Sequence, residues 1–181
     1  MEKKHLKKYQ HAPAHLFLEN YPYFITAGTY LKQHFFTSDQ GKALLLEAIQ
    51  QTLWKSSTDL MAWAILSNHY HLVMGLKDPF LLPEIIRKIH SESSVELNKT
   101  EKQTGRKIWQ NYWDRCIRDE KDYYCKMNYV HFNPVKHGYT EEPSEYGFSS
   151  YGLYMKKLGR EQLERIVMKY PWDQLDEKDD Y

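Results

Sequence analysis

Cysteine is scarce in this sequence, since only Cys116 and Cys125 occur among its 181 residues. Their spacing matches neither a zinc ribbon nor a redox-active pair, so we expect two free thiols that pack inside a protein of a reducing compartment. No apolar run approaches the roughly 20 residues that span a bilayer, and the charged start lacks the apolar region of a secretory signal. We therefore expect a soluble, cytoplasmic protein with no membrane segment.

An excess of charge of one sign is also missing, because 25 Lys and Arg residues stand against 24 Asp and Glu residues, a formal net charge of +1. The balance is uneven along the chain. Residues 1–160 hold 22 basic and 17 acidic side chains (+5), whereas residues 161–181 hold 3 and 7 (−4). The length suits one domain with a sizeable core. We predict a single domain over residues 1–160, opening with a basic N-terminal arm, and an acidic C-terminal tail over residues 161–181.

Turn signals and the periodicity of apolar residues predict alternating strands and helices. We expect strands at residues 23–30, 60–67, 70–76 and 108–117, and helices at 39–55, from 83 to a polar segment ending at 105, and from 119 to 133. The last helix should stop at Asn133, because Pro134 disfavours helical geometry at the residue before it. This order predicts an α+β fold, an antiparallel sheet with helices packed on one face.

The most informative segment is LSNHYHLV at residues 66–73, which sets two imidazoles two residues apart in a strand-like run. Side chains at i and i+2 share one face of a strand, so His69 and His71 can bind one divalent ion. Tyr70 and Leu72 should face the opposite way, into whatever covers the sheet. A metal site needs more than two ligands.

Further ligands are suggested by NYVHFNPV at residues 128–135. Tyr129 and Asn133 stand at i and i+4 of the expected helix, so they lie one turn apart on one face. A phenol and an amide oxygen could then meet the histidine pair together.

Four blocks of the sequence resemble the single-tyrosine HUH transposases, an IS200-like family, and in particular the branch associated with repetitive extragenic palindromes (REP). The blocks occur in the family's order and are LSNHYHLV (66–73), DRCIRDE (114–120), YVHFNPVKHG (129–138) and FSSY (148–151). Two departures are Tyr139, where the family usually has an aliphatic residue, and Gly147-Phe148, where a Pro-aromatic pair is common. Neither departure touches the inferred chemistry.

The resemblance implies a ferredoxin-like fold with an additional helix that carries a nucleophilic tyrosine. It implies that Tyr129 attacks single-stranded DNA to form a 5′-phosphotyrosine link, and that His69, His71 and Asn133 hold Mg²⁺ or Mn²⁺. The implied partner is single-stranded DNA with hairpin (palindromic) elements, and a homodimer is possible. The base that would assist the phenol is left open between His131 and His137.

Two other functions stay open from the sequence. A metal-dependent nuclease could use the same histidines with water as the nucleophile, and a non-catalytic hairpin-binding protein could keep the fold and its basic surface. Basic clusters are either a solvated face or a phosphate-binding one. The residues expected to contact DNA are Lys3, Lys4, Lys7, Lys8, Arg87, Lys88, Arg115 and Arg118.

Overall fold

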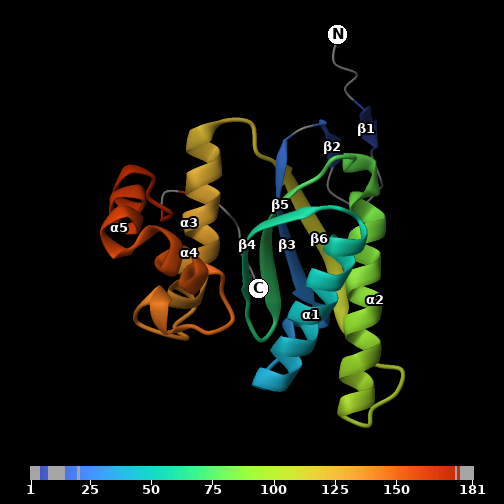
Figure 1. Cartoon of the computed structure of the whole chain (residues 1–181). Coiled ribbons are helices and arrows are strands. Elements are labelled where there is room, and N and C mark those ends of the chain that lie inside the picture. The colour runs from blue at the N-terminus through green and yellow to red at the C-terminus, as the bar shows by residue number, and fades with distance from the viewer. Residues whose placement is uncertain (1–4, 8–14, 20, 174, 176–181) are drawn as a thin grey trace.

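A four-stranded antiparallel sheet forms the centre of the computed structural model, which describes residues 5–7, 15–19, 21–173 and 175 (Figure 1). The strands stand in the spatial order β4-β5-β3-β6 and are β3 (Pro22–Thr29), β4 (Asp59–Ile65), β5 (His69–Gly75) and β6 (Trp109–Cys116). Helix α1 (Asp39–Lys55) joins β3 to β4, and α2 (Leu82–Thr100) joins β5 to β6. This βαββαβ order is the ferredoxin-like arrangement, so the predicted fold class is confirmed.

The alternation of side chains along the strands gives the sheet two buried faces. Tyr70, Leu72 and Met74 of β5 join the core beneath α1 and α2. His69 and His71 point to the other face, which is covered by α3 (Glu120–Lys136). Figure 1 shows α1 and α2 on one side of the sheet and α3 on the other. Thus α1 and α2 share one face as expected, and the helix of Tyr129 closes the opposite face.

Capping residues set the starts of two helices where the sequence predicts them. Ser38 precedes α1, and its Oγ accepts a hydrogen bond from the backbone N–H of Gly41 at 3.1 Å. Asp119 precedes α3, and its Oδ1 accepts from the backbone N–H of Asp122 at 2.8 Å. Each bond satisfies a backbone donor that lacks a partner in the first turn of a helix.

The predicted end of the last helix, Asn133, is wrong, because α3 continues through Pro134 to Lys136. Proline removes one backbone donor and disfavours helix before it, but near the end of a helix few later bonds depend on it. The N–H of His137 donates to the carbonyl of Asn133 at 3.1 Å, and that of Tyr139 donates to Pro134 at 2.9 Å. Tertiary packing of α3 on the sheet outweighs the local preference, and the final turn survives.

Several shorter elements complete the chain and were not predicted. They are the paired strands β1 (His5–Lys7) and β2 (His15–Phe17), the 3-10 turns η1 (Tyr30–Lys32), η2 (Pro79–Leu81) and η3 (Pro143–Glu145), and the helices α4 (Tyr151–Leu158) and α5 (Arg160–Lys169). Helix α5 packs on α3, where Asn128 Nδ2 donates to the carbonyl of Tyr170 at 2.7 Å and Leu163 is buried. The first residues of the acidic segment 161–181 are therefore folded against the domain.

Both cysteines are buried free thiols, as expected. Over the described part of the chain, no helix combines the length and the apolar character needed to cross a bilayer.

A partly buried polar contact supports the packing of α2 on the sheet. The Nε2 of His90 lies 2.9 Å from the hydroxyl of Tyr70, and its ring stacks on Trp109 with 4.5 Å between centroids. The indole N–H of Trp109 donates in turn to Ser93 at 3.0 Å. Burial lowers the pKa of His90 from 6.5 to about 3, so this histidine is neutral in the folded protein near neutral pH.

We expect the free energy of unfolding to decrease as the pH falls from 6.5 towards 3, because the unfolded chain binds a proton that folded His90 excludes. His90→Gln keeps a hydrogen-bonding group beside Tyr70 and should make this slope shallower by up to about 1.4 kcal/mol per pH unit. Urea unfolding at several pH values measures both slopes. Above the unfolded pKa the two proteins should show the same pH dependence, and identical slopes below it would contradict the prediction.

Candidate active site

The two histidines of β5 lie side by side on the face that α3 covers. Their side chains are almost fully buried, with 1% of His69 and 0% of His71 exposed, and their ring centroids are 5.1 Å apart. Thr26 of β3 stands opposite His71, and its hydroxyl lies 2.8 Å from His71 Nδ1. That contact fixes Nδ1, so Nε2 is the nitrogen of His71 that would serve as a ligand.

Two amide oxygens flank His69. Asn68 Oδ1 lies 2.8 Å from His69 Nδ1, and Asn133 Oδ1, from α3, lies 3.0 Å from His69 Nε2. A neutral imidazole carries one N–H, so only one of these oxygens can accept a hydrogen bond from the ring. The other contact brings two lone pairs together. When the N–H is on Nδ1 and donates to Asn68, a cation between His69 Nε2 and Asn133 Oδ1 would turn the second contact from repulsive to favourable.

Tyr129 stands one turn before Asn133 on α3 and is 1% exposed. Its ring packs edge-on against His71 and Phe24, with centroid distances of 5.4 and 5.9 Å. The four residues that the sequence singles out, His69, His71, Tyr129 and Asn133, therefore meet within one chain. No second copy is required to complete this set among the described residues.

The electrostatic surroundings keep both histidines neutral. Burial, followed by the neighbouring His137, lowers the pKa of His69 to about 3. Burial also holds the pKa of His71 well below its usual range, and His69, His137, Lys136 and Lys126 act in the same direction. Neutral imidazole is the form that binds metals, so these surroundings favour a ligand role over a charged one.

A divalent ion fits the donor atoms of this site. Two ligands at right angles and about 2.1 Å from one ion lie about 3 Å apart, which is the separation of His69 Nε2 and Asn133 Oδ1. Within the described ranges, no three His, Cys, Asp or Glu side chains form a group suited to an ion. The amide oxygen of Asn133 is a further donor beside the histidines, and it carries no charge to balance an ion.

Sequence reasoning missed Thr26, Asn68 and Lys136. Thr26 is 45 residues from His71, and only the pairing of β3 with β5 reveals their contact. Lys136 belongs to the turn of α3 beyond Pro134, where the sequence predicts no helix, and its Nζ donates to the Tyr129 hydroxyl at 2.9 Å. Asn68 was visible as the neighbour of His69, but no pattern in the sequence indicates which way its amide points.

The two candidate bases occupy different surroundings. His131 is 3% exposed and lies between α3 and α4, where its Nε2 is 2.8 Å from the Ser150 hydroxyl and its ring packs on Tyr151 and Tyr154. These contacts indicate that His131 has a structural role in packing α3 on α4. His137 lies at the site, with its ring centroid 4.8 Å from that of His69, and burial lowers its pKa.

The basic residues predicted to contact DNA do not gather in one place. Lys3, Lys4 and Lys8 lie outside the described residues, and the side chain of Lys7 in β1 is not described. Arg87 and Lys88 belong to α2, on the far side of the sheet from α3.

Arg115 and Arg118 lie nearer the site. Arg115 of edge strand β6 is exposed and stands opposite Phe24, so it shares the sheet face of the histidines. Trp113, which is 43% exposed, stands on the same face opposite Thr26. Arg118 is exposed in the connection to α3. A strip of β6 beside the site thus offers one cation and one aromatic ring to solvent.

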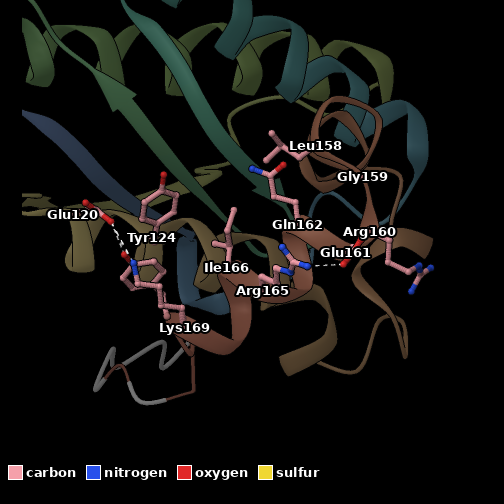
Figure 2. A pocket seen from close by; sticks show the side chains of 11 residues that line it. Glu120, Tyr124, Leu158, Gly159, Arg160, Glu161, Gln162, Arg165, Ile166 and Lys169 are labelled. Atoms are coloured by element: carbon pink, nitrogen blue, oxygen red, sulfur yellow. Dashed lines mark hydrogen bonds and ion pairs between the residues drawn. The ribbon is translucent and has the colours of Figure 1, made fainter.

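A separate groove of about 680 Å³ lies between α3 and α5 (Figure 2). Glu120 and Tyr124, which line it, belong to the first turns of α3, far along the helix from Asn133. Two basic residues that line the groove form ion pairs with carboxylates: Arg165 is 2.6 Å from Glu161, and Lys169 is 3.8 Å from Glu120. This mixed polar groove is distinct from the candidate active site.

Sequence comparisons place most of the chain in a known family. Residues 6–131 match the family described as IS200-like transposases. A REP-associated tyrosine transposase of Haemophilus influenzae is 31% identical over 114 residues, which are 58% of this chain and 65% of that protein. One from Escherichia coli K12 is 31% identical over 104 residues, 53% of this chain and 59% of that protein. The matched region therefore spans less than two thirds of either relative.

The fold also has a counterpart among solved structures. A REP-associated tyrosine transposase bound to a REP hairpin superposes with a TM-score of 0.62, covering 97% of this chain and 94% of that one. The two sequences are 22% identical, so the likeness concerns the fold.

We expect His69→Ala and His71→Ala each to weaken Mn²⁺ binding roughly tenfold or more, since each removes a ligand atom. Asn133→Ala should also weaken binding, whereas Asn133→Gln retains an amide oxygen and part of the affinity. Titration followed by electron paramagnetic resonance measures free Mn²⁺ directly.

His90→Gln is the matched control, because it alters a half-buried histidine of α2, which contacts Tyr70 on the opposite face of the sheet. Circular dichroism should show that all variants are folded. Wild-type Mn²⁺ affinity in both alanine variants of the pair would rule out this site.

Proposed function

Because this chain belongs to the IS200-like transposase family, we propose that it cuts and rejoins single-stranded DNA at hairpin-associated sites through a covalent link to Tyr129. The observation that carries the proposal is the meeting of a tyrosine, two neutral histidines and an asparagine amide on one face of the sheet. The proposed nucleophile, Tyr129, therefore lies next to the proposed metal ligands.

Tyr129 would act as the nucleophile of a phosphoryl transfer. Its hydroxyl oxygen attacks phosphorus in line, a bond from that oxygen to phosphorus forms, and the bond to the 3′ oxygen breaks. The departing 3′ oxygen takes up a proton, which leaves a free 3′ hydroxyl and a 5′ phosphate on the tyrosine. The link conserves the phosphodiester energy, so attack by another 3′ hydroxyl rejoins DNA without ATP.

His69, His71 and Asn133 would hold the divalent ion, Mg²⁺ or Mn²⁺, that the family chemistry requires. When bound, such an ion polarises the scissile phosphate and stabilises charge on the departing 3′ oxygen. The residues themselves contribute position and protonation state. Thr26 fixes the ring of His71 through Nδ1, and burial keeps both imidazoles neutral near pH 7.

Single-stranded DNA with hairpin elements is the proposed substrate. The structural neighbour with the same fold was solved with a REP hairpin, which supports this choice. In this chain, Trp113 and Arg115 offer a stacking surface and a phosphate contact on the edge strand, beside the histidine face. Base stacking on an aromatic ring contributes about 1–3 kcal/mol per base, so a strand that crosses β6 would be held next to Tyr129.

The decisive prediction is a covalent adduct. With Mg²⁺ and a 3′-labelled hairpin strand, the label should shift to a protein-sized species on a denaturing gel, because the 5′ phosphate of the downstream fragment stays on the phenol. Tyr129→Phe removes one oxygen while keeping the ring's packing on His71, so it should bind DNA and form no adduct.

Tyr124→Phe provides the control, since Tyr124 lies on the same helix and stacks on Tyr170 away from the site. A free labelled fragment in place of the adduct would indicate a nuclease that uses water. Intact DNA with tight binding would indicate a non-catalytic hairpin-binding protein. Mass spectrometry that locates the adduct on Tyr139 would move the nucleophile to another phenol.

A second prediction separates two arginines that look equivalent in the sequence. Arg115→Gln should weaken binding of single-stranded DNA and lower the slope of log affinity against log salt by about 0.7, as loss of one phosphate contact requires. Arg87→Gln should leave both quantities unchanged, because α2 lies on the far side of the sheet. Fluorescence anisotropy at several salt concentrations measures the slopes, and equal effects of the two substitutions would contradict the placement of DNA on β6.

A further inference from the structure

The last turn of α3 brings Lys136 onto the hydroxyl of Tyr129. Its Nζ donates to the phenol oxygen at 2.9 Å and lies 4.7 Å from the centre of the ring. The two residues stand seven positions apart, two turns along one face of the helix. The lysine therefore contacts the atom that becomes the nucleophile in the proposed reaction.

We propose that Lys136 is a catalytic residue, whose ammonium group stabilises the negative charge on the Tyr129 oxygen during attack and departure. This inference rests on the proposed function, in which Tyr129 forms the covalent link. Lys136 belongs to the block YVHFNPVKHG (129–138), in which the resemblance assigns roles only to Tyr129 and Asn133.

The chemistry of the phenol explains why a cation is needed there. A phenol ordinarily has a pKa of about 10, so little phenolate exists near neutral pH. A positive charge within hydrogen-bonding distance favours the oxyanion over the neutral hydroxyl. In the forward step the phenol proton passes to water, the oxygen bonds to phosphorus, and the ammonium keeps its own protons. In the reverse step the phenolate departs from phosphorus, and the same ammonium stabilises it.

The position of Lys136 depends on a stretch of helix that continues despite proline. If α3 ended at Asn133, as proline ordinarily dictates, the lysine would have no helical geometry to direct it back to Tyr129. The segment that follows is tied to the β4–β5 connection, because the Tyr139 hydroxyl contacts the hydroxyl of Ser67. Tyr146 adds a hydrogen bond to the carbonyl of Ile65 at 2.8 Å. These contacts hold the final turn of α3 near the histidine pair.

The other candidates for assisting the phenol have different contacts. His131 lies 2.8 Å from Ser150 between α3 and α4, and the ring of His137 packs on His69. Lys136 is the residue that donates a hydrogen bond to the Tyr129 hydroxyl, and Lys136 is exposed to solvent. It can therefore contact the phenol from the side on which DNA would arrive.

The test compares Lys136→Met, which keeps the length of the side chain, with Lys136→Arg, which keeps the charge. Single-turnover formation of the covalent adduct should slow about 100-fold in Lys136→Met, a loss typical of removing one group that stabilises an oxyanion. Lys136→Arg should retain most of the rate. Hairpin affinity and Mn²⁺ affinity, measured separately, should stay close to wild type in both variants.

A more acidic phenol distinguishes a charge effect from a structural one. Replacing Tyr129 by difluorotyrosine should restore much of the rate in the Lys136→Met background and change the wild-type background little. Without DNA, the fluorine resonance of the same residue at fixed pH should shift when Lys136 is replaced by Met, because the ammonium contacts the phenol oxygen. This second readout does not depend on activity.

Each outcome decides the proposal. A wild-type rate in Lys136→Met, or a loss confined to DNA affinity, would overturn the catalytic role while leaving the covalent mechanism in place. A slow variant that difluorotyrosine does not rescue, with an unchanged fluorine resonance, would reduce Lys136 to a structural role. Absence of any adduct in the wild-type protein would overturn both this inference and the proposed function.

Discussion

The two-residue alternation along β5 is the constraint on which the rest of the structure depends. This strand lies inside the sheet, between β4 and β3, and helices cover both of its faces, so its side chains are buried on either side. Tyr70, Leu72 and Met74 enter the core beneath α1 and α2, which places His69 and His71 on the opposite face, where α3 must close over them. A slip of one residue in register would exchange the two sets and bury imidazoles in the apolar core. The same burial that stabilises the sheet removes water from the histidines and keeps them neutral.

Local patterns in the sequence were sufficient for the parts of the fold that follow from neighbouring residues. The limits of α1 agree with the prediction, and the starts of β5 and α3 lie within one residue of it, because each depends on a capping side chain or on strand periodicity. The end of α3 was wrong, because packing on the sheet outweighs the local effect of Pro134. The contact between Thr26 and His71 was beyond reach for a different reason, since it depends on the register of two strands 45 residues apart.

Helix α5 shows how few buried side chains a docked helix needs. Half of the ten residues of α5 are charged, and Leu163 is its one buried side chain, so the composition there indicates an acidic tail rather than a docked helix. Its attachment comes instead from the polar side chain of Asn128, which donates to the carbonyls of Ile166 and Tyr170 at 3.4 and 2.7 Å. Both carbonyls lie at the C-terminal end of α5. That of Ile166 also accepts the backbone N–H of Tyr170 at 2.9 Å, so the amide of Asn128 adds a side-chain bond to this end of the helix. Asn128 is the neighbour of Tyr129, so this contact also fixes the rotation of α3 about its axis.

The candidate active site has little negative charge of its own to balance a divalent ion. Its ligands are neutral imidazoles and an amide, and the nearby Lys126 and Lys136 are cations that help to lower the pKa of His71. Lys126 is fully buried, with its Nζ 4.7 Å from the centre of the Phe24 ring. Among the residues that the structure describes, no group of carboxylates stands by to balance a divalent ion. Under the proposed function, the scissile phosphate supplies the missing negative charge, so ion and DNA should each strengthen the binding of the other by the same factor. The site would then assemble its full charge only when a substrate phosphate lies beside Tyr129, which confines the reactive arrangement to the bound complex.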